Sequence, residues 1–313
     1  MTPWVDLSTG INPWPYPNIE IDPEDVFHLP LSQNMMGCRI AMAQYLKVAE
    51  STLVLAPGSE LLIKLLPNII SPKKVAIISP TYGDHQRAWS GTAYDVEELS
   101  ALPGRMDDYD SIVLCHPNNP DGRLYDIDVL ETTRQGLARK GGWLIIDEAY
   151  ADLYPSLSMT HMAGQDGLII LRSLGKFFGL AGLRLGAILA PPAILGVVSN
   201  RLGVWPISGP TLTIATRAYQ DQAWQEQTRH RLQKARDTLD EGLRAGGLNI
   251  VGGCDLFRFV ETQDAVSLWD HLARSGIYTR LFRWSDKHLR IGLPADKQQL
   301  QRLSTALQSL SFK

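Results

Sequence analysis

Short runs of apolar residues, many of them β-branched, recur along the first two thirds of the chain. Five of these runs predict β-strands, at residues 75–79, 111–115, 143–147, 168–172 and 185–190. Segments with a helical pattern separate several of them, as at 59–70 and 127–139. Near-continuous apolar strands that alternate with helices are typical of a mostly parallel sheet whose two faces are both covered. The pattern therefore predicts an α/β protein.

The pattern differs on either side of this block. Residues 1–34 are rich in proline, which prevents long helices and indicates an extended arm. From about 211 to 245, polar residues spaced among apolar ones predict one or two long amphipathic helices. A helix is expected around 265–275, and further strands at 248–251, 256–260, 277–282 and 288–292.

These changes of pattern predict three parts. The first is an N-terminal arm, residues 1–34, which we expect to join the small domain. The second is a large domain, residues 35–210, and the third is a small C-terminal α+β domain, residues 211–313.

Composition and charge exclude several classes of protein. With 313 residues, 44% of them hydrophobic, and a net charge of only −3, the chain is expected to fold around a large core. The near-neutral charge offers no basic surface for nucleic acid, and no apolar run approaches the ~20 residues of a membrane span. The N-terminus lacks a signal-peptide pattern, and the three cysteines form no C-x-x-C pair, so we expect a cytoplasmic protein.

One lysine, Lys176, has a distinctive sequence context. It lies in the segment Ser-Leu-Gly-Lys-Phe-Phe-Gly-Leu-Ala-Gly-Leu-Arg-Leu-Gly (173–186), just after a predicted strand and eight residues before Arg184. The segment fits neither the P-loop pattern nor the G-x-G-x-x-G dinucleotide fingerprint. A lone lysine in such a loop is usually a surface residue, so its interpretation depends on the residues that accompany it.

Several candidate residues follow predicted strands or begin a helix. Asp147 ends the strand at 143–147, and Asn119 and Tyr82 follow two earlier strands. Ligands of α/β sheets bind at these carboxyl ends. Ser59 and Glu60 begin a predicted helix, whose free N–H groups and positive dipole end favour an anion. Alone, Asp147 could equally cap a helix and Asn119 could serve only a turn.

Together, these residues form the inventory that pyridoxal phosphate requires. Lys176 can form a Schiff base, and Asp147 can face the protonated ring nitrogen. The ring and its hydroxyl can be bound by Tyr82, Asn119 and Tyr150. The phosphate can be bound by the start of the helix at residue 59 together with Ser173 and Arg184. No metal is expected, because the seven histidines show no metal-ligand spacing and are assigned structural roles.

On these motifs, the chain resembles the fold-type I pyridoxal-phosphate enzymes of the aminotransferase class I/II superfamily, from residue 6 to residue 293. The resemblance implies a three-layer α/β/α large domain with a mostly parallel sheet, a smaller α+β domain and a homodimer. It implies that Lys176, Asp147 and Tyr150 are catalytic. It also assigns cofactor binding to these three and to Ser59, Glu60, Tyr82, Asn119, Ser173 and Arg184.

Within this superfamily, residues 6–17 (Asp-Leu-Ser-Thr-Gly-Ile-Asn-Pro-Trp-Pro-Tyr-Pro) resemble the N-terminal signature of the threonine-phosphate decarboxylases of cobalamin biosynthesis. This resemblance implies decarboxylation of L-threonine O-3-phosphate to (R)-1-amino-2-propanol O-2-phosphate. It assigns substrate binding to Gly10, Asn119, Arg280 and Arg290, with Arg290 on the carboxylate. A small substrate with two anionic groups needs several cations, and Arg283 lies in the same stretch, although a solvated strand edge also explains Arg283.

Two alternatives stay open at this stage. One is an aminotransferase of the histidinol-phosphate type that acts on a phosphorylated amine or amino acid, and a more remote one is a non-catalytic regulator with the same fold. Leu29 stands where those aminotransferases have a tyrosine, which counts against the first alternative. The decarboxylases usually have a short His/Gly-rich segment upstream of residue 6, which we expect to be missing. Gly175 stands where many relatives have a hydroxyl residue, so we expect one phosphate contact fewer.

Overall fold

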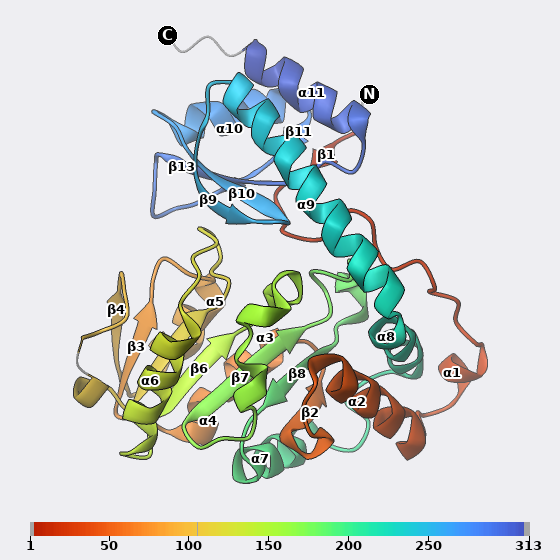
Figure 1. Ribbon diagram of the computed structural model, residues 1–313, viewed down its shortest axis with the longest axis vertical. Helices are drawn as coiled ribbons and strands as arrows, with labels where there is room; N and C mark the ends of the chain where they lie inside the picture. Colours follow the sequence, from red (N-terminus) through yellow and green to blue (C-terminus); the bar gives the residue numbers. More distant parts are fainter. Residues whose placement is uncertain (1–2, 105, 310–313) are drawn as a thin grey trace.

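A seven-stranded sheet organises the larger part of the computed structural model, which describes residues 3–104 and 106–309 (Figure 1). In spatial order its strands are β2 (Leu53–Ala56), β8 (Gly186–Leu189), β7 (Leu168–Ser173), β6 (Trp143–Asp147), β5 (Ser111–Cys115), β3 (Lys74–Ile78) and β4 (Asp95–Leu99). Of the seven, β8 alone runs in the direction opposite to the other six. The predicted α/β fold with a mostly parallel sheet is therefore confirmed.

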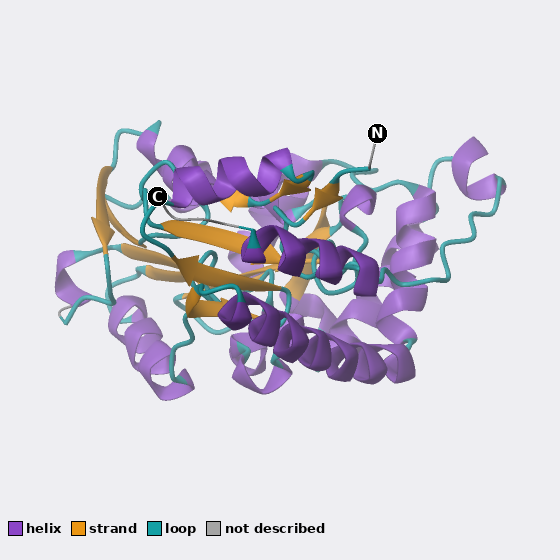
Figure 2. Ribbon diagram, turned by 90° about the horizontal axis from the view of Figure 1, so that it is seen from above, coloured by secondary structure: helices purple, strands orange, loops and turns teal. Residues whose placement is uncertain are grey.

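Both faces of this sheet are buried, which explains the uninterrupted apolar runs. In β6, Leu144 and Ile146 belong to one hydrophobic core, whereas Ile145 belongs to a second core on the opposite face. Helices on one face are α2 (Ser32–Leu46), α6 (Ile127–Ala138) and α8 (Gly209–Gln220). Helices on the other are α3 (Ser59–Leu65), α4 (Pro67–Ile70), α5 (Gly83–Ser90) and α7 (Pro192–Leu202). Seen from above, the strands lie between these helices (Figure 2).

Two strands of the large sheet and one break between helices beside it were not anticipated. The strands β2 and β4 lie at the two edges of the sheet, and the sequence pattern did not predict them. The strand β4 reads Asp-Val-Glu-Glu-Leu and has no buried residue, so it lacks the apolar run of a central strand. The helical segment predicted at 59–70 forms two helices, α3 and α4, on either side of Leu66. Pro67 has no amide hydrogen to continue the helical ladder, although Leu66 keeps helical dihedrals.

A four-stranded antiparallel sheet forms the second part of the molecule. Its strands, in spatial order, are β12 (Arg280–Leu281), β13 (His288–Gly292), β10 (Phe257–Glu261) and β9 (Asn249–Cys254). The helices α9 (Gln222–Ala245), α10 (Ala265–Arg274) and α11 (Lys297–Gln308) pack with this sheet around the apolar residues of its core. Helix α9 runs from the neighbourhood of α8 up to this sheet (Figure 1). The Asp221 carboxylate accepts the amide of Trp224 and begins α9, so the region 211–245 forms two helices.

The N-terminal arm links the two sheets. Its strand β1 (Val5–Asp6) pairs in parallel with β11 (Ile277–Tyr278), and it later forms the single turn α1 (Glu24–Phe27). The strand predicted over 277–282 is divided at Thr279, because its first half pairs with β1 and its second half, β12, pairs with β13. The division into three domains remains a prediction. No helix in the described ranges is both long and apolar enough to cross a bilayer.

Candidate active site

A pocket lies at the carboxyl ends of the central strands, beside the turn that follows β7. All nine residues that the sequence assigned to the cofactor line it: Ser59, Glu60, Tyr82, Asn119, Asp147, Tyr150, Ser173, Lys176 and Arg184. Six further residues complete the lining, namely Gly58, Cys115, Ala149, Gly175, Ala181 and Leu185. Parallel strands bring their carboxyl ends to the same edge of a sheet, which is why residues so far apart in sequence meet here.

Lys176 offers an amine that no described residue engages by hydrogen bond or ion pair. The centre of the Tyr150 ring lies 6.0 Å from Nζ. Burial lowers the pKa of Lys176, and the positive charges of Arg290 and Arg184 lower it further, against the opposing effect of Asp147. A lowered pKa leaves more of the amine neutral at a given pH, which makes it a better nucleophile.

Asp147 presents a buried carboxylate whose two oxygens are both held. Its Oδ1 accepts the amide of Ala149 at 3.0 Å, and its Oδ2 lies 2.9 Å from Nε2 of His85. Both side chains are almost inaccessible to solvent. Burial alone would lower the pKa of the imidazole, but the Cys115 sulfur and the Asp147 carboxylate raise it to about 10. At neutral pH the two groups therefore form a buried ion pair.

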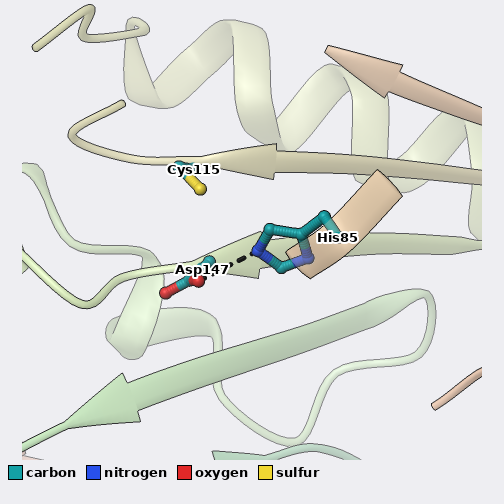
Figure 3. Close-up of side chains that lie close together, drawn as sticks. All are labelled: His85, Cys115 and Asp147. Carbon is teal, nitrogen blue, oxygen red and sulfur yellow. Dashed lines mark hydrogen bonds and ion pairs between the residues drawn. The ribbon is translucent and has the colours of Figure 1, made fainter. Parts of the chain in front are cut away.

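The role of His85 was missed from the sequence, which assigned it only a structural position. His85 lies on the first turn of α5, three residues after Tyr82, and points from that helix toward the end of β6 (Figure 3). That spacing from a pocket residue is the signal available in the sequence, since residues three apart on a helix share a face. No pattern in the sequence, however, identifies Asp147 as its partner.

His85, Cys115 and Asp147 also form the one group, within the described ranges, whose metal-ligand atoms come close together. One ligand atom from each lies within 4.8 Å of the other two (Figure 3). Nε2 of His85 faces Oδ2 of Asp147 at 2.9 Å, which is the geometry of a hydrogen-bonded pair. We therefore interpret the group as an ion pair with a neighbouring thiol.

The start of α3 forms the anion-binding end of the pocket. The backbone amides of its first turn have no partner within the helix, and the positive end of the helix dipole faces the pocket. Gly58 precedes the helix with φ +83°, and a Cβ there would lie 3.1 Å from Nη2 of Arg184. Arg184 itself has φ +53° and donates to Glu60 at 3.3 Å. The guanidinium is thus held beside the free amides, as a phosphate group requires.

Two tyrosines and one asparagine form the walls. Tyr82 is partly exposed at the pocket and meets His85 edge to face, with 6.2 Å between ring centres. Tyr150 is buried, and burial raises the pKa of its hydroxyl, so it stays a protonated donor. Asn119 lies in the turn after β5, where its Oδ1 accepts a hydrogen bond from Arg290 at 2.5 Å. These groups can contact a flat ring and its oxygen substituent.

The residues assigned to the substrate differ in how close they lie to the pocket. Arg290, on β13, donates Nη2 to the carbonyl of Ser8 at 2.8 Å, and its buried Nε has no partner among the described atoms. Gly10 abuts Tyr150, because a Cβ at residue 10 would lie 2.7 Å from the tyrosine hydroxyl. Arg280 is exposed on β12 and does not line the pocket, although it is paired in register with Arg290. Arg283 is exposed beyond the end of β12.

These donors fit pyridoxal phosphate. The pocket combines an unpaired lysine, a carboxylate that can hold a proton on a ring nitrogen, an aromatic wall and an anion-binding helix start. Gly175 also belongs to this fit, because a Cβ there would lie only 3.0 Å from Cα of Ala181. A side chain there would require Ala181 to shift by a few tenths of an ångström, and the glycine itself offers no hydroxyl to the phosphate.

Comparison with known proteins gives a consistent result. Residues 37–307 match the family described as aminotransferase class I and II. A threonine-phosphate decarboxylase of Pseudomonas aeruginosa is 39% identical over 99% of this chain and 92% of its own, and one of a Sinorhizobium species is 37% identical over 97% and 91%. A histidinol-phosphate aminotransferase of Legionella pneumophila (strain Paris) is 32% identical over 64% of this chain and 56% of its own.

A solved structure supports the fold alone. The histidinol-phosphate aminotransferase of Sinorhizobium meliloti, in complex with pyridoxal-5'-phosphate, superposes with a TM-score of 0.85 at 17% identity. The superposition covers 97% of this chain and 90% of that one.

Proposed function

The chain belongs to the aminotransferase class I and II family, and from this premise we propose that it is a pyridoxal-phosphate-dependent decarboxylase of L-threonine O-3-phosphate. Its products are CO₂ and (R)-1-amino-2-propanol O-2-phosphate, an intermediate of cobalamin biosynthesis. The observation that carries this proposal is the similarity to two threonine-phosphate decarboxylases at 39% and 37% identity over nearly the whole chain.

When bound, pyridoxal phosphate supplies an electron-withdrawing ring on which a carbanion next to the amine is stabilised. Lys176 would hold the aldehyde end of the cofactor through its amine, and the same amine, once released, would be placed to return a proton to the substrate carbon. Asp147, fixed by His85, would keep the proton on the ring nitrogen. Tyr150 would donate to the ring oxygen, and the start of α3 with Arg184 would hold the phosphate.

The substrate has two anionic groups, and we assign a cation to each. Arg290 grips the carboxylate, because its unpartnered Nε leaves a donor free beside the two that are used. Arg280 grips the substrate phosphate. The pair Arg280 and Arg290 is directly opposed on antiparallel strands, so both side chains project from the same face of the sheet.

An aminotransferase of the histidinol-phosphate type is the second candidate, since relatives with that name match part of the chain. They are less similar, at 32% identity over 64% of the chain for the Legionella protein. The test is to supply L-threonine O-3-phosphate and measure CO₂ and aminopropanol phosphate. Formation of a keto acid that depends on an added α-keto acid, without CO₂, would replace the decarboxylase by the aminotransferase.

We further propose that two copies assemble into a homodimer in the cytoplasm. The support is a series of exposed apolar side chains on the arm, α1 and α2: Ile19, Ile21, Val26, Phe27, Leu29, Leu31, Met36 and Ile40. Monomers rarely leave so long an apolar stretch in water. Light scattering should give twice the 34.8 kDa of one chain, and a monomer at micromolar concentration would contradict the dimer. The cytoplasmic location is supported by three cysteines that are all free and buried.

A further inference from the structure

The N-terminal arm runs alongside the segment that follows Lys176 and is hydrogen-bonded to it. The amide of Asn12 donates to the carbonyl of Lys176 at 3.0 Å, and that of Tyr16 donates to the carbonyl of Phe178 at 2.9 Å. The approach is close, because a Cβ at Gly179 would lie 2.7 Å from Cα of Pro15. The turn that holds the reactive lysine is therefore bounded on one side by a segment more than 160 residues away in sequence.

The side chain of Asn12 adds a third bond to this contact. Its Nδ2 donates to the carbonyl of Phe177 at 2.8 Å, and its Oδ1 accepts the amide of Trp14 at 2.9 Å. Only 2% of Asn12 is exposed. Because one end of the amide faces a donor and the other an acceptor, its orientation is fixed, and an aspartate could not replace it without setting two acceptors against each other.

The same arm also reaches Arg290, beside the pocket, and Tyr150, in its wall. The carbonyl of Ser8 accepts the Arg290 guanidinium, and Gly10 packs against the Tyr150 hydroxyl. The amide of Leu7 donates to the carbonyl of Tyr278, and its carbonyl accepts the amide of Gly292, which ties the arm to β11 and β13. A five-residue stretch from Ser8 to Asn12 thus contacts the arginine assigned to substrate, the tyrosine wall and the lysine turn.

We propose that Asn12 is a positioning residue for Lys176. Its main-chain and side-chain bonds fix the backbone at Lys176 and Phe177, and so set where the flexible lysine side chain begins relative to Asp147 and the pocket. Lysine has four rotatable bonds, and Nζ of Lys176 has no hydrogen-bonded partner among the residues that the structure describes, so its placement depends on the backbone that carries it. The inference rests on the proposed function only in taking Lys176 as the residue that binds the cofactor.

The test compares Asn12→Asp with Asn18→Asp. Both substitutions are isosteric and lie on the arm, but the Asn18 amide donates to the Tyr16 hydroxyl, which can instead donate to a carboxylate. We expect Asn12→Asp to lower kcat about tenfold or more with KM for L-threonine O-3-phosphate changed less than about threefold, and Asn18→Asp to change neither. In the cofactor-free protein, the pH profile of Lys176 acylation, followed by mass spectrometry, should shift in Asn12→Asp and stay unchanged in Asn18→Asp.

Asn12→Gln, which keeps an amide, should recover part of kcat and part of the wild-type pH profile of Lys176 acylation. The same variant replaces Asn12→Asp in the test if the aspartate variant does not fold. A folded Asn12→Asp protein with unchanged kcat and unchanged Lys176 labelling would overturn the proposal, as would equal losses in both aspartate variants. If the wild-type protein does not release CO₂ from threonine phosphate, the proposed function fails. The labelling of Lys176 still decides the role of Asn12, so the two failures are distinguishable.

Discussion

His85 and Asp147 form a buried ion pair on the pocket wall, with 2.9 Å between Nε2 of the imidazole and Oδ2 of the carboxylate. Replacing the imidazole in His85→Asn removes this charge-assisted bond and leaves the carboxylate with the Ala149 amide alone. We expect a loss of roughly 10- to 100-fold in cofactor affinity or kcat, measured by equilibrium dialysis and steady-state kinetics. The exposed His230 provides the control, His230→Asn, which should resemble wild type. Unchanged affinity and kcat in His85→Asn would contradict this role.

The same ion pair predicts a pH dependence of stability. The pKa of His85 is raised in the folded protein from 6.5 to about 10, so the folded state holds a proton that the unfolded state releases. The contribution of the ion pair to the free energy of unfolding is therefore complete below about pH 6.5 and is lost as the pH rises toward 10. Thermal unfolding of wild type and His85→Asn should show the largest difference near pH 6 and a shrinking one up to pH 10. A difference that stays constant across this range would be inconsistent with the pair.

Lys176→Ala should abolish the visible absorbance band of the bound cofactor and reduce turnover by about a thousandfold or more, because no other described lysine lines the pocket. The lowered pKa of Lys176 further predicts that acylation of the cofactor-free protein begins at lower pH there than at the exposed Lys297. Mass spectrometry of labelled peptides compares the two lysines in one sample. A band that survives in Lys176→Ala would rule out this lysine.

Arg290→Ala should raise KM for threonine phosphate by roughly 100-fold while leaving cofactor affinity within about threefold. The expectation follows from its position, next to Asn119 but outside the pocket lining. Arg290→Lys should recover little, since a lysine cannot make the same set of planar contacts. Arg280→Ala should also raise KM for threonine phosphate. Because Arg280 is assigned to the substrate phosphate, this change should weaken binding of the carboxylate less than Arg290→Ala does. Equal losses of substrate and cofactor binding in Arg290→Ala would refute the assignment.

Gly10→Ala should impair the enzyme through packing alone. The added Cβ would lie 2.7 Å from both the Tyr150 hydroxyl and a ring carbon of Phe257, which must then move. We expect a fall in kcat or substrate affinity of about tenfold or more, measured with the cofactor bound. Gly37→Ala is the matched control, because a Cβ in the middle of α2 has no neighbour within 4 Å and favours the helix. If both alanine variants have the same kcat and substrate affinity, the close contact at Gly10 does not affect activity.

The sequence predicted the central strands well, because strands that are buried on both faces consist of uninterrupted apolar residues. The strands β5 and β6 coincide with the predicted ranges 111–115 and 143–147. The edge strand β4 could not be found in this way, since it gains its place by pairing with β3 and not by burying an apolar run. The halves of the segment 277–282 likewise belong to different sheets, a choice of partner that no local pattern records.

The pocket shows the same division between local and long-range information. Its cofactor residues follow strands or begin α3. Since ligands of α/β sheets bind at the carboxyl ends of the strands, the sequence was enough to assign these residues to one site. His85 and Asn12 were not identified, because their importance lies in bonds to residues 62 and 165 positions away. Arg280 is exposed, and its side chain makes no hydrogen bond or ion pair within the described ranges, so its role depends on a substrate and stays a prediction.

The hydrogen bond between Ser8 and Arg290 joins residues 282 positions apart. On a ribosome, the arm therefore emerges first, yet its partners on β11 and β13 are synthesised almost last. A nascent chain can build the large sheet while its first residues are still without their pairing strand. The residues that line the pocket, from Gly58 to Leu185, are synthesised well before the C-terminal strands, whereas the side of the site where the arm meets Arg290 is completed only when those strands have been made.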